Sequence, residues 1–424
     1  MDHGKKLSKE TLLPSLLEDN DTTTKSEELQ PEEQRASWTE VDMHMLKGQH
    51  SHPDGNMLDR GEGTGEARER APREEECVIS EENYDTDLEL SDKEDAFDPT
   101  GQTCYLEACE KFKVVPASCF LKQMRNSELS MMHRGLGPQG TKAMAVPLVT
   151  NTSIVRLNLR DNWMEGMGGA AIAKMLKDNC YITEVDLSDN NLGDDGARAI
   201  AGMLMKNSIL EKLNLSGNHF TDQSAEHFSP ALITNTKLQH LDISYNALGE
   251  QAGQRLGYSL SENTGLRSLN LAWNCIQGSG AAALANGLGG NIFLRTVDLS
   301  FNGFGKEGAI ALGQALKENV VLEELNVSNN RIPPEGAICL AMGLRVNKTI
   351  KSLNMGRNPI QNSGCYRLLK SVQENQHSAM ESLDFSDITV NQDFEDLYAA
   401  VKEMFPVLTV NHRGRTGTFK EAKA

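Results

Sequence analysis

The stretch of sequence that decides the fold spans residues 308–330 and reads GAIALGQALKENVVLEELNVSNN. Its second half, from Leu322 to Asn330, has the form L-x-x-L-x-[LV]-x-x-N, in which apolar residues alternate as they do on a strand with one buried face. Its first half carries apolar residues at the spacing of a helix. One strand and one helix cannot bury both apolar stripes alone, so the stretch predicts a fold built by stacking copies of this unit.

Copies of the unit recur along most of the chain at an interval of 28 residues. The strand-like runs begin at Ile154, Ile182, Leu210, Leu238, Leu266, Leu294, Leu322 and Ile350. They close at Asn162, Asn190, Asn218, Asn246, Asn274, Asn302, Asn330 and Asn358. We expect each closing amide to hydrogen-bond the backbone of the turn that leaves the strand. A second asparagine series in phase with the first, from Asn151 to Asn375, is expected to end each helix in the left-handed conformation.

This regularity predicts an α/β leucine-rich-repeat solenoid, a right-handed β/α horseshoe with a parallel sheet on the concave side and helices on the convex side. Neighbouring strands lie about 4.8 Å apart and packed helices about 8 to 10 Å apart, so a stack of such units must bend. We therefore expect the strand residues that point away from the core to line the inside of the arc.

With its uniform units, the chain resembles the ribonuclease-inhibitor-like leucine-rich-repeat proteins over residues 126–410. That group includes ribonuclease inhibitor, Ran GTPase-activating protein and the sensor arms of NOD-like receptors. The segments CYLEACEKFKVVPASCF (104–120) and LGPQG (136–140) are most similar to the leucine-rich repeat-containing protein 74 group. The resemblance implies the fold and a habit of binding other proteins, and it transfers no activity.

The composition changes sharply near residue 100. Residues 1–100 hold 28 acidic residues against 11 Lys or Arg, whereas the rest of the chain is nearly neutral. Such an acidic, aperiodic segment cannot bury enough apolar surface to offset its ordering entropy. We predict a disordered acidic segment at 1–98, an N-terminal cap with a first partial repeat at 99–153, eight repeats at 154–379, a C-terminal cap repeat at 380–410, and a basic tail at 411–424.

Several function classes receive no support from the sequence. A nearly neutral body has no basic stripe for nucleic acid. No apolar run approaches the roughly 20 residues that cross a bilayer, and no signal peptide precedes the array, so we expect no membrane contact and a cytoplasmic protein, with the nucleus left open. The cysteines show no ligand spacing, and motifs for nucleotide, zinc or serine chemistry are missing from the sequence. We expect a monomer with no enzymatic activity, no cofactor and no metal.

The candidate partner-binding residues come from two positions of the repeat. The residue before the closing asparagine is aromatic in three consecutive repeats, at Tyr245, Trp273 and Phe301. Aromatic and arginine side chains dominate interface hot spots, so these rings, rimmed by His240 and Arg357, form the predicted interaction patch. The alternative is that the rings simply cover the turn.

The second position lies on the exposed face of the strands and is always Asp or Asn, as at Asp242 and Asp298. It predicts a docking strip for Lys or Arg of a partner, unless these side chains hydrogen-bond between neighbouring strands instead. In the acidic segment, Thr86-x-x-Glu89 and Ser91-x-x-Glu94 have the spacing that acidophilic kinases accept, which makes Thr86 and Ser91 candidate phosphorylation sites.

These features predict a non-enzymatic scaffold that binds another protein, whose identity the sequence does not give, on its concave face. The alternative is a GTPase regulator resembling Ran GTPase-activating protein, although in that family the acidic block follows the repeats and here it precedes them. GTP turnover by small GTPases with and without this protein distinguishes the two, because a scaffold leaves the rate unchanged.

Overall fold

The computed structural model of the chain describes residues 101–415. The predicted disordered segment at 1–98, the candidate phosphorylation sites Thr86 and Ser91, and residues 416–424 of the predicted tail lie outside the described residues.

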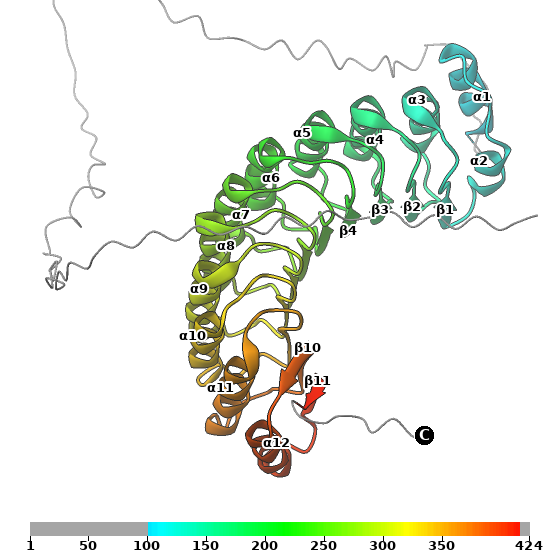
Figure 1. Cartoon of the computed structure of the whole chain (residues 1–424). Coiled ribbons are helices and arrows are strands. Elements are labelled where there is room, and N and C mark those ends of the chain that lie inside the picture. The colour runs from blue at the N-terminus through cyan, green and yellow to red at the C-terminus, as the bar shows by residue number, and fades with distance from the viewer. Residues whose placement is uncertain (1–100, 416–424) are drawn as a thin grey trace, which may run out of the picture. The chain divides into compact units, whose positions relative to one another are not determined.

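One parallel sheet runs through the described part of the chain, with its eleven strands in sequence order (Figure 1). The strands are β1 Glu128–Ser130, β2 Arg156–Asn158, β3 Glu184–Asp186, β4 Lys212–Asn214, β5 His240–Asp242, β6 Ser268–Asn270, β7 Thr296–Asp298, β8 Glu324–Asn326, β9 Ser352–Asn354, β10 Ser382–Val390 and β11 Thr409–Arg415. From β2 to β9, residues 28 positions apart pair with one another, as Arg156 does with Glu184. The period of the sequence is therefore the register of the sheet.

Two helices precede the first strand, and the helices that follow connect successive strands and form the outer side of an arc whose inner side is the sheet (Figure 1). They are α1 Gln102–Lys111, α2 Ser118–Gln123, α3 Gly137–Leu148, α4 Glu165–Asp178, α5 Gly193–Leu204, α6 Asp222–Thr234, α7 Glu250–Glu262, α8 Gly278–Gly290, α9 Gly305–Glu318, α10 Pro334–Leu344, α11 Gln361–Glu374 and α12 Gln392–Met404. The predicted leucine-rich-repeat solenoid is confirmed. Within residues 101–415, no helix has the length and apolar character that a bilayer crossing requires.

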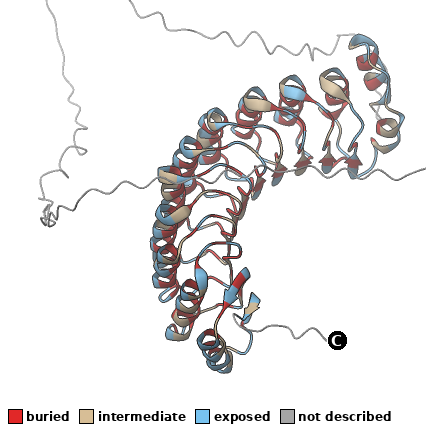
Figure 2. Cartoon of the chain, viewed as in Figure 1, coloured by how far each residue is buried: buried red, intermediate tan, exposed pale blue. Residues whose placement is uncertain are grey.

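A single apolar core lies between the sheet and the helices (Figure 2). Each strand from β1 to β9 buries its middle residue and leaves both neighbours more accessible on the concave surface. In β7 the buried middle residue is Val297, and its more accessible neighbours are Thr296 and Asp298. The core is continuous because every repeat covers the apolar stripe of the next.

The closing asparagines hydrogen-bond the turns, as predicted. The Asn190 side chain is fully buried, and its Nδ2 donates to the carbonyls of Leu159, Leu187 and Ser188 at 2.9, 3.0 and 2.9 Å. Its Oδ1 accepts from the backbone N–H of Asn162 at 2.8 Å. One amide therefore serves backbone groups of two adjacent repeats, which would otherwise be buried without partners.

The prediction for the second asparagine series is wrong. Asn291 ends helix α8 in an extended conformation, with φ −78° and ψ 130°. Its Oδ1 accepts from the N–H groups of Phe293 and Leu294 at 2.8 Å each, and its Nδ2 donates to the Leu260 carbonyl at 2.7 Å. Because the side chain bonds the backbone that follows α8 and a carbonyl of the preceding helix, the backbone needs no left-handed residue at this point.

The two ends of the array differ. At the first strand, the Gln123 amide accepts from the N–H of Ser130 at 3.1 Å and donates to its carbonyl at 3.4 Å, so it occupies the place of a neighbouring strand. At the other end, the predicted tail beginning at residue 411 is wrong for residues 411–415, which belong to β11. Ile388 stands where a closing asparagine would turn the chain, so β10 continues for nine residues and gives β11 a longer partner.

Candidate functional site

The Asp and Asn side chains along the concave face have a structural task. Asp242 Oδ1 accepts from the N–H of Ser244 at 2.9 Å, and Asp298 Oδ1 accepts from the N–H of Ser300 at 2.8 Å. The same contact, to the N–H two residues later, recurs at Asn158, Asp186, Asn214, Asn270, Asn326, Asn354 and Asp384. Only a short side chain with an oxygen acceptor makes this turn, which explains why the position is Asp or Asn from β2 to β10. In β1 the equivalent residue is Ser130.

The second carboxylate oxygens of Asp242 and Asp298 also have partners in the sheet. Asp242 Oδ2 accepts from Asn270 Nδ2, and Asp298 Oδ2 accepts from Asn326 Nδ2, each at 2.9 Å. These contacts are hydrogen bonds between neighbouring strands, which the sequence analysis gave as the alternative to a docking strip. Both carboxylates line the concave surface, and both oxygens of each already accept hydrogen bonds.

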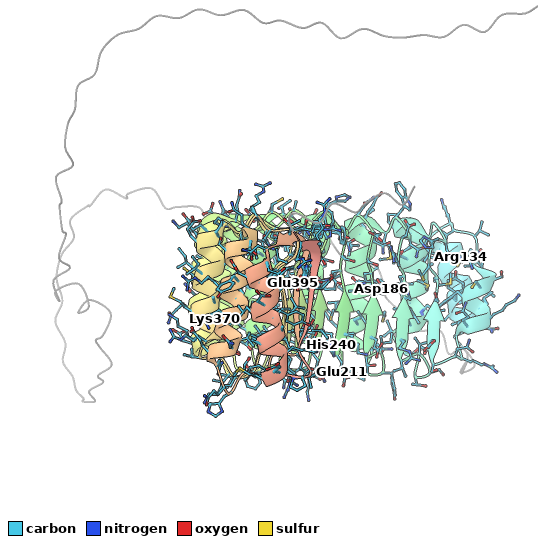
Figure 3. The ribbon with its side chains drawn as sticks, turned by 60° about the horizontal axis from the view of Figure 1, so that its bottom comes forward. Arg134, Asp186, Glu211, His240, Lys370 and Glu395 are labelled. Carbon is cyan, nitrogen blue, oxygen red and sulfur yellow. The ribbon has the colours of Figure 1, made fainter. Side chains whose placement is uncertain are left out.

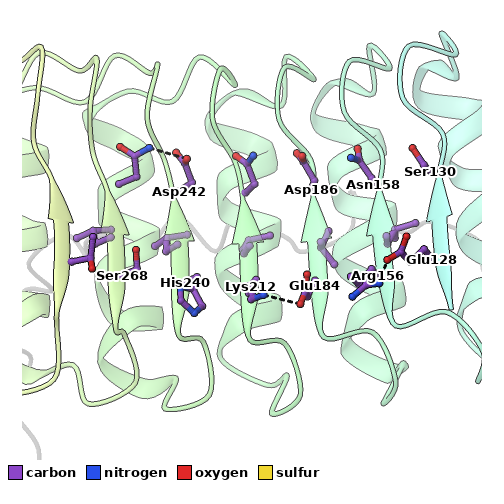
Figure 4. Close-up of a pocket in the computed structure, with 18 of the residues that line it drawn as sticks. Glu128, Ser130, Arg156, Asn158, Glu184, Asp186, Lys212, His240, Asp242 and Ser268 are labelled. Atoms are coloured by element: carbon purple, nitrogen blue, oxygen red, sulfur yellow. Dashed lines mark hydrogen bonds and ion pairs between the residues drawn. The ribbon is translucent and has the colours of Figure 1, made fainter. Parts of the chain in front are cut away.

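A groove of about 780 Å³ follows the concave surface from β1 to β7 (Figure 4). At the beginning of the strands, charges of opposite sign alternate along it. Lys212 Nζ lies 2.8 Å from Glu184 Oε1, and Arg156 pairs with Glu128. Exposed pairs of this kind contribute about 0 to 1 kcal/mol each to stability, so they set the local charge of the groove more than they hold the fold together.

His240 stands next in this row of side chains and does not reach the aromatic residues. It begins β5 and lines the groove, whereas Tyr245 follows the other end of the same strand. In Figure 4, His240 and Asp242 lie at opposite ends of the strand. Figure 3 places His240 and Asp186 on the strand side of the arc and Lys370 on the helix side. The prediction that His240 rims the aromatic patch is wrong, because the length of the strand separates them.

Tyr245, Trp273 and Phe301 form a continuous stack, which we call the ring stack. The ring centroids of Tyr245 and Trp273 lie 5.2 Å apart with an interplanar angle of 12°, and those of Trp273 and Phe301 lie 3.8 Å apart at 11°. The stacking follows from the fold, because equivalent residues of adjacent repeats lie about one strand spacing, 4.8 Å, apart. Tyr245 is 58% and Trp273 is 44% exposed, so the stack is accessible.

All three ring-stack residues have left-handed backbones, with φ between 53° and 54°. Each turns the chain out of its strand just before the closing asparagine. The same turn is made by Asp189 at φ 57° and by Gly217 at φ 68°. The left-handed region that we predicted for the end of the helix therefore lies here, at the end of the strand.

Beside the ring stack is a cleft of about 410 Å³, which we call the arginine cleft. It is lined by Trp273, Phe301, Asn302, Asn329, Arg331, Arg357 and Pro359. Arg357 Nε pairs with Asp387 Oδ2 at 2.7 Å, whereas Arg331 has no ion pair among the described residues. The lining holds two guanidinium groups and no carboxylate.

The structure therefore divides the predicted partner-binding residues into two groups. Tyr245, Trp273, Phe301 and Arg357 gather beyond the carboxyl ends of the strands, and His240, Asp242 and Asp298 line the groove. Sequence reasoning missed Arg331, which directly follows a closing asparagine. Comparing that position between repeats would have found it, because an arginine stands there beside the aromatic repeats. Within residues 101–415, no group of three or more His, Cys, Asp or Glu is arranged to hold a metal ion.

A family model described as leucine-rich repeat matches the chain in eight segments. They are residues 150–173, 178–201, 206–229, 234–256, 262–285, 290–313, 318–341 and 346–369.

Proteins of similar sequence are named for the same kind of repeat. Leucine-rich repeat-containing protein 74B from Homo sapiens is 49% identical over 76 residues, which is 18% of this chain and 19% of that protein. The protein of the same name from Mus musculus is 52% identical over 54 residues, or 13% of this chain and 14% of that protein. The chain thus matches less than a fifth of the length of either relative. An internalin from Listeria monocytogenes aligns over 74% of this chain and 90% of its own, with 13% identity and a TM-score of 0.38.

Proposed function

This chain belongs to the leucine-rich-repeat family, and on that premise we propose that it is a non-enzymatic scaffold that binds another protein through its ring stack and the adjoining concave groove. The coarse part of this proposal, protein binding, is what the family implies. The ring stack is the observation that carries the finer part.

The backbone of the ring stack supports a binding role. A left-handed residue with a bulky side chain is disfavoured by roughly 1 to 2 kcal/mol. Other repeats make the same turn with Gly217 or Asn329, so the turn itself does not require a ring. Stacking returns about 0.5 to 1.5 kcal/mol per ring pair, which offsets part of this cost and leaves large apolar surfaces in solvent. A partner that covers those surfaces would explain why three rings stand together there.

The exposed area is sufficient for an interface hot spot. An aromatic side chain buries about 150 to 250 Å² when it is fully covered, so a half-exposed ring offers roughly 100 Å². At about 25 cal/mol per Å², covering one such ring stabilises a complex by about 2.5 kcal/mol. Values of this size match the side chains that dominate measured interfaces.

The proposal is tested by capturing partners on the immobilised full chain, identifying the most abundant one, and titrating it against variants. We expect Trp273→Ala to weaken binding at least 10-fold. Tyr258→Ala is the matched control, because Tyr258 is 64% exposed and lies on α7, on the convex side. If the double variant Tyr245→Ala/Trp273→Ala binds the partner as tightly as the control does, the rings only cover the turn and the proposal fails.

A further inference from the structure

The arginine cleft extends the ring stack by one position. Trp273 and Phe301 come from consecutive repeats, and Asn329 stands in the next repeat where a fourth ring would be. Its short side chain leaves the space that the cleft occupies. Trp273 covers one face of Phe301 at 3.8 Å, so a planar group entering the cleft can extend the stack from Phe301.

The charge of the cleft indicates what should accompany that planar group. Arg331 is exposed and has no ion pair among residues 101–415, and Arg357 shares its charge with Asp387 alone. A guanidinium binds a carboxylate strongly because it offers two parallel donors to the two oxygens. The cleft therefore suits an aromatic ring that is followed directly by a carboxylate.

The chain itself contains this combination twice outside the described residues, at Tyr84-Asp85 and Phe97-Asp98. Both lie in the acidic segment, whose charge is opposite to that of the cleft. Resting on the proposed function of the ring stack, we propose that Tyr84 and Asp85 occupy the arginine cleft and compete there with the partner protein. Tyr84 extends the stack from Phe301, and Asp85 pairs with Arg331.

Chain length selects Tyr84 over Phe97. Seventeen positions separate Tyr84 from Gly101 and span up to about 55 to 60 Å, whereas the four positions after Phe97 span about 14 Å. From β1 to β8, seven strand steps of about 4.8 Å cover roughly 34 Å along the sheet, and Gly101 lies farther still from the cleft, beside Pro147 of α3. Four positions cannot span such a distance, whereas seventeen positions leave about 20 Å beyond it for the path from Gly101 to the sheet. A tethered segment binds at an effective concentration near the millimolar range, so a weak contact is sufficient to compete with a partner.

The test uses the full chain with a benzophenone amino acid in place of Tyr84, and the photocrosslinked residues are mapped by mass spectrometry. We expect crosslinks to residues 301–331 in products of monomer size, with a yield that tenfold dilution leaves unchanged. The matched control has the same amino acid at Phe97 and should not label this segment. Arg331→Glu should lower the Tyr84 crosslink at least fivefold. Arg367→Glu, an exposed arginine on α11, should leave it unchanged.

Four results would overturn the inference. The first is the absence of any crosslink from Tyr84 to residues 301–331, and the second is a Tyr84 crosslink that resists Arg331→Glu. The others are equal labelling from Phe97, and products of dimer size that disappear on dilution, which would assign the cleft to a second copy. The crosslink needs no partner, so its failure is separate from that of the proposed function. If Trp273→Ala still weakens partner binding while the crosslink is absent, only the inference fails. If the inference holds, Tyr84→Ala in the full chain should raise the affinity for the partner about threefold or more.

Discussion

The closest helix contacts in the solenoid depend on glycine, so we predict that adding a methyl group at such a contact destabilises the protein. A Cβ atom added at Gly287, on α8, would lie 2.0 Å from the backbone oxygen of Gly257 and 2.7 Å from its carbonyl carbon, on α7. Both atoms belong to the backbone, so no side-chain rotation relieves the clash. Ordinary contact begins at 3.4 Å, so Gly287→Ala forces the two helices apart by more than 1 Å.

The magnitude follows from two opposing effects. Overpacking of a tightly packed contact costs about 1 to 3 kcal/mol, and a clash between two backbones belongs at the upper end of that range. Replacing a helical glycine by alanine returns up to about 1 kcal/mol. We therefore expect Gly287→Ala to lower the free energy of unfolding by about 2 kcal/mol. Gly202 on α5 is the matched control, because an added Cβ meets nothing within 4 Å there. Gly202→Ala should stabilise the protein by about 0.5 to 1 kcal/mol.

The two variants are compared by urea denaturation followed by circular dichroism. The midpoint should fall for Gly287→Ala and rise for Gly202→Ala, with little change in the slope of the transition. The reasoning is refuted if both variants shift the midpoint in the same direction, or if Gly287→Ala is as stable as the wild type.

Two further variants test the buried asparagines and a partly buried acid. Asn190→Ala removes an amide that bonds four backbone groups, so it should lower the free energy of unfolding by about 3 kcal/mol or more. Asn126 is exposed, so Asn126→Ala should change the urea midpoint little. Equal midpoints for the two variants would contradict the role of the closing asparagine. Burial raises the pKa of Asp194, but hydrogen bonds from Ser224 and Thr221 lower it more, so its pKa lies below the ordinary value of 3.8. The charged form stabilises the folded state above that pH and loses this effect as the pH falls through the folded-state pKa. Asp194→Asn should therefore be destabilised relative to the wild type at pH 7, with a difference that shrinks in thermal melts below about pH 4; a difference independent of pH would exclude this carboxylate as the cause.

The sequence by itself determined the repeat architecture. A repeat interacts chiefly with its two neighbours, so the identity of one unit and the constancy of its spacing are sufficient to specify strand register, sheet direction and curvature. For the same reason, the sequence placed Tyr245, Trp273 and Phe301 together, since equivalent positions of adjacent repeats must lie one strand spacing apart.

The tertiary structure alone decided how the polar groups are used. It showed that Asp242 is hydrogen-bonded within the sheet, that His240 lies a strand's length from Tyr245, and that Arg331 shares a cleft with Phe301. It also showed that the left-handed residues lie at the ends of the strands and not in the second asparagine series, and that residues 411–415 belong to the sheet. Such outcomes depend on which backbone donors and acceptors remain unpaired after the repeats have stacked, and that becomes known only when the neighbouring chain segments are in place.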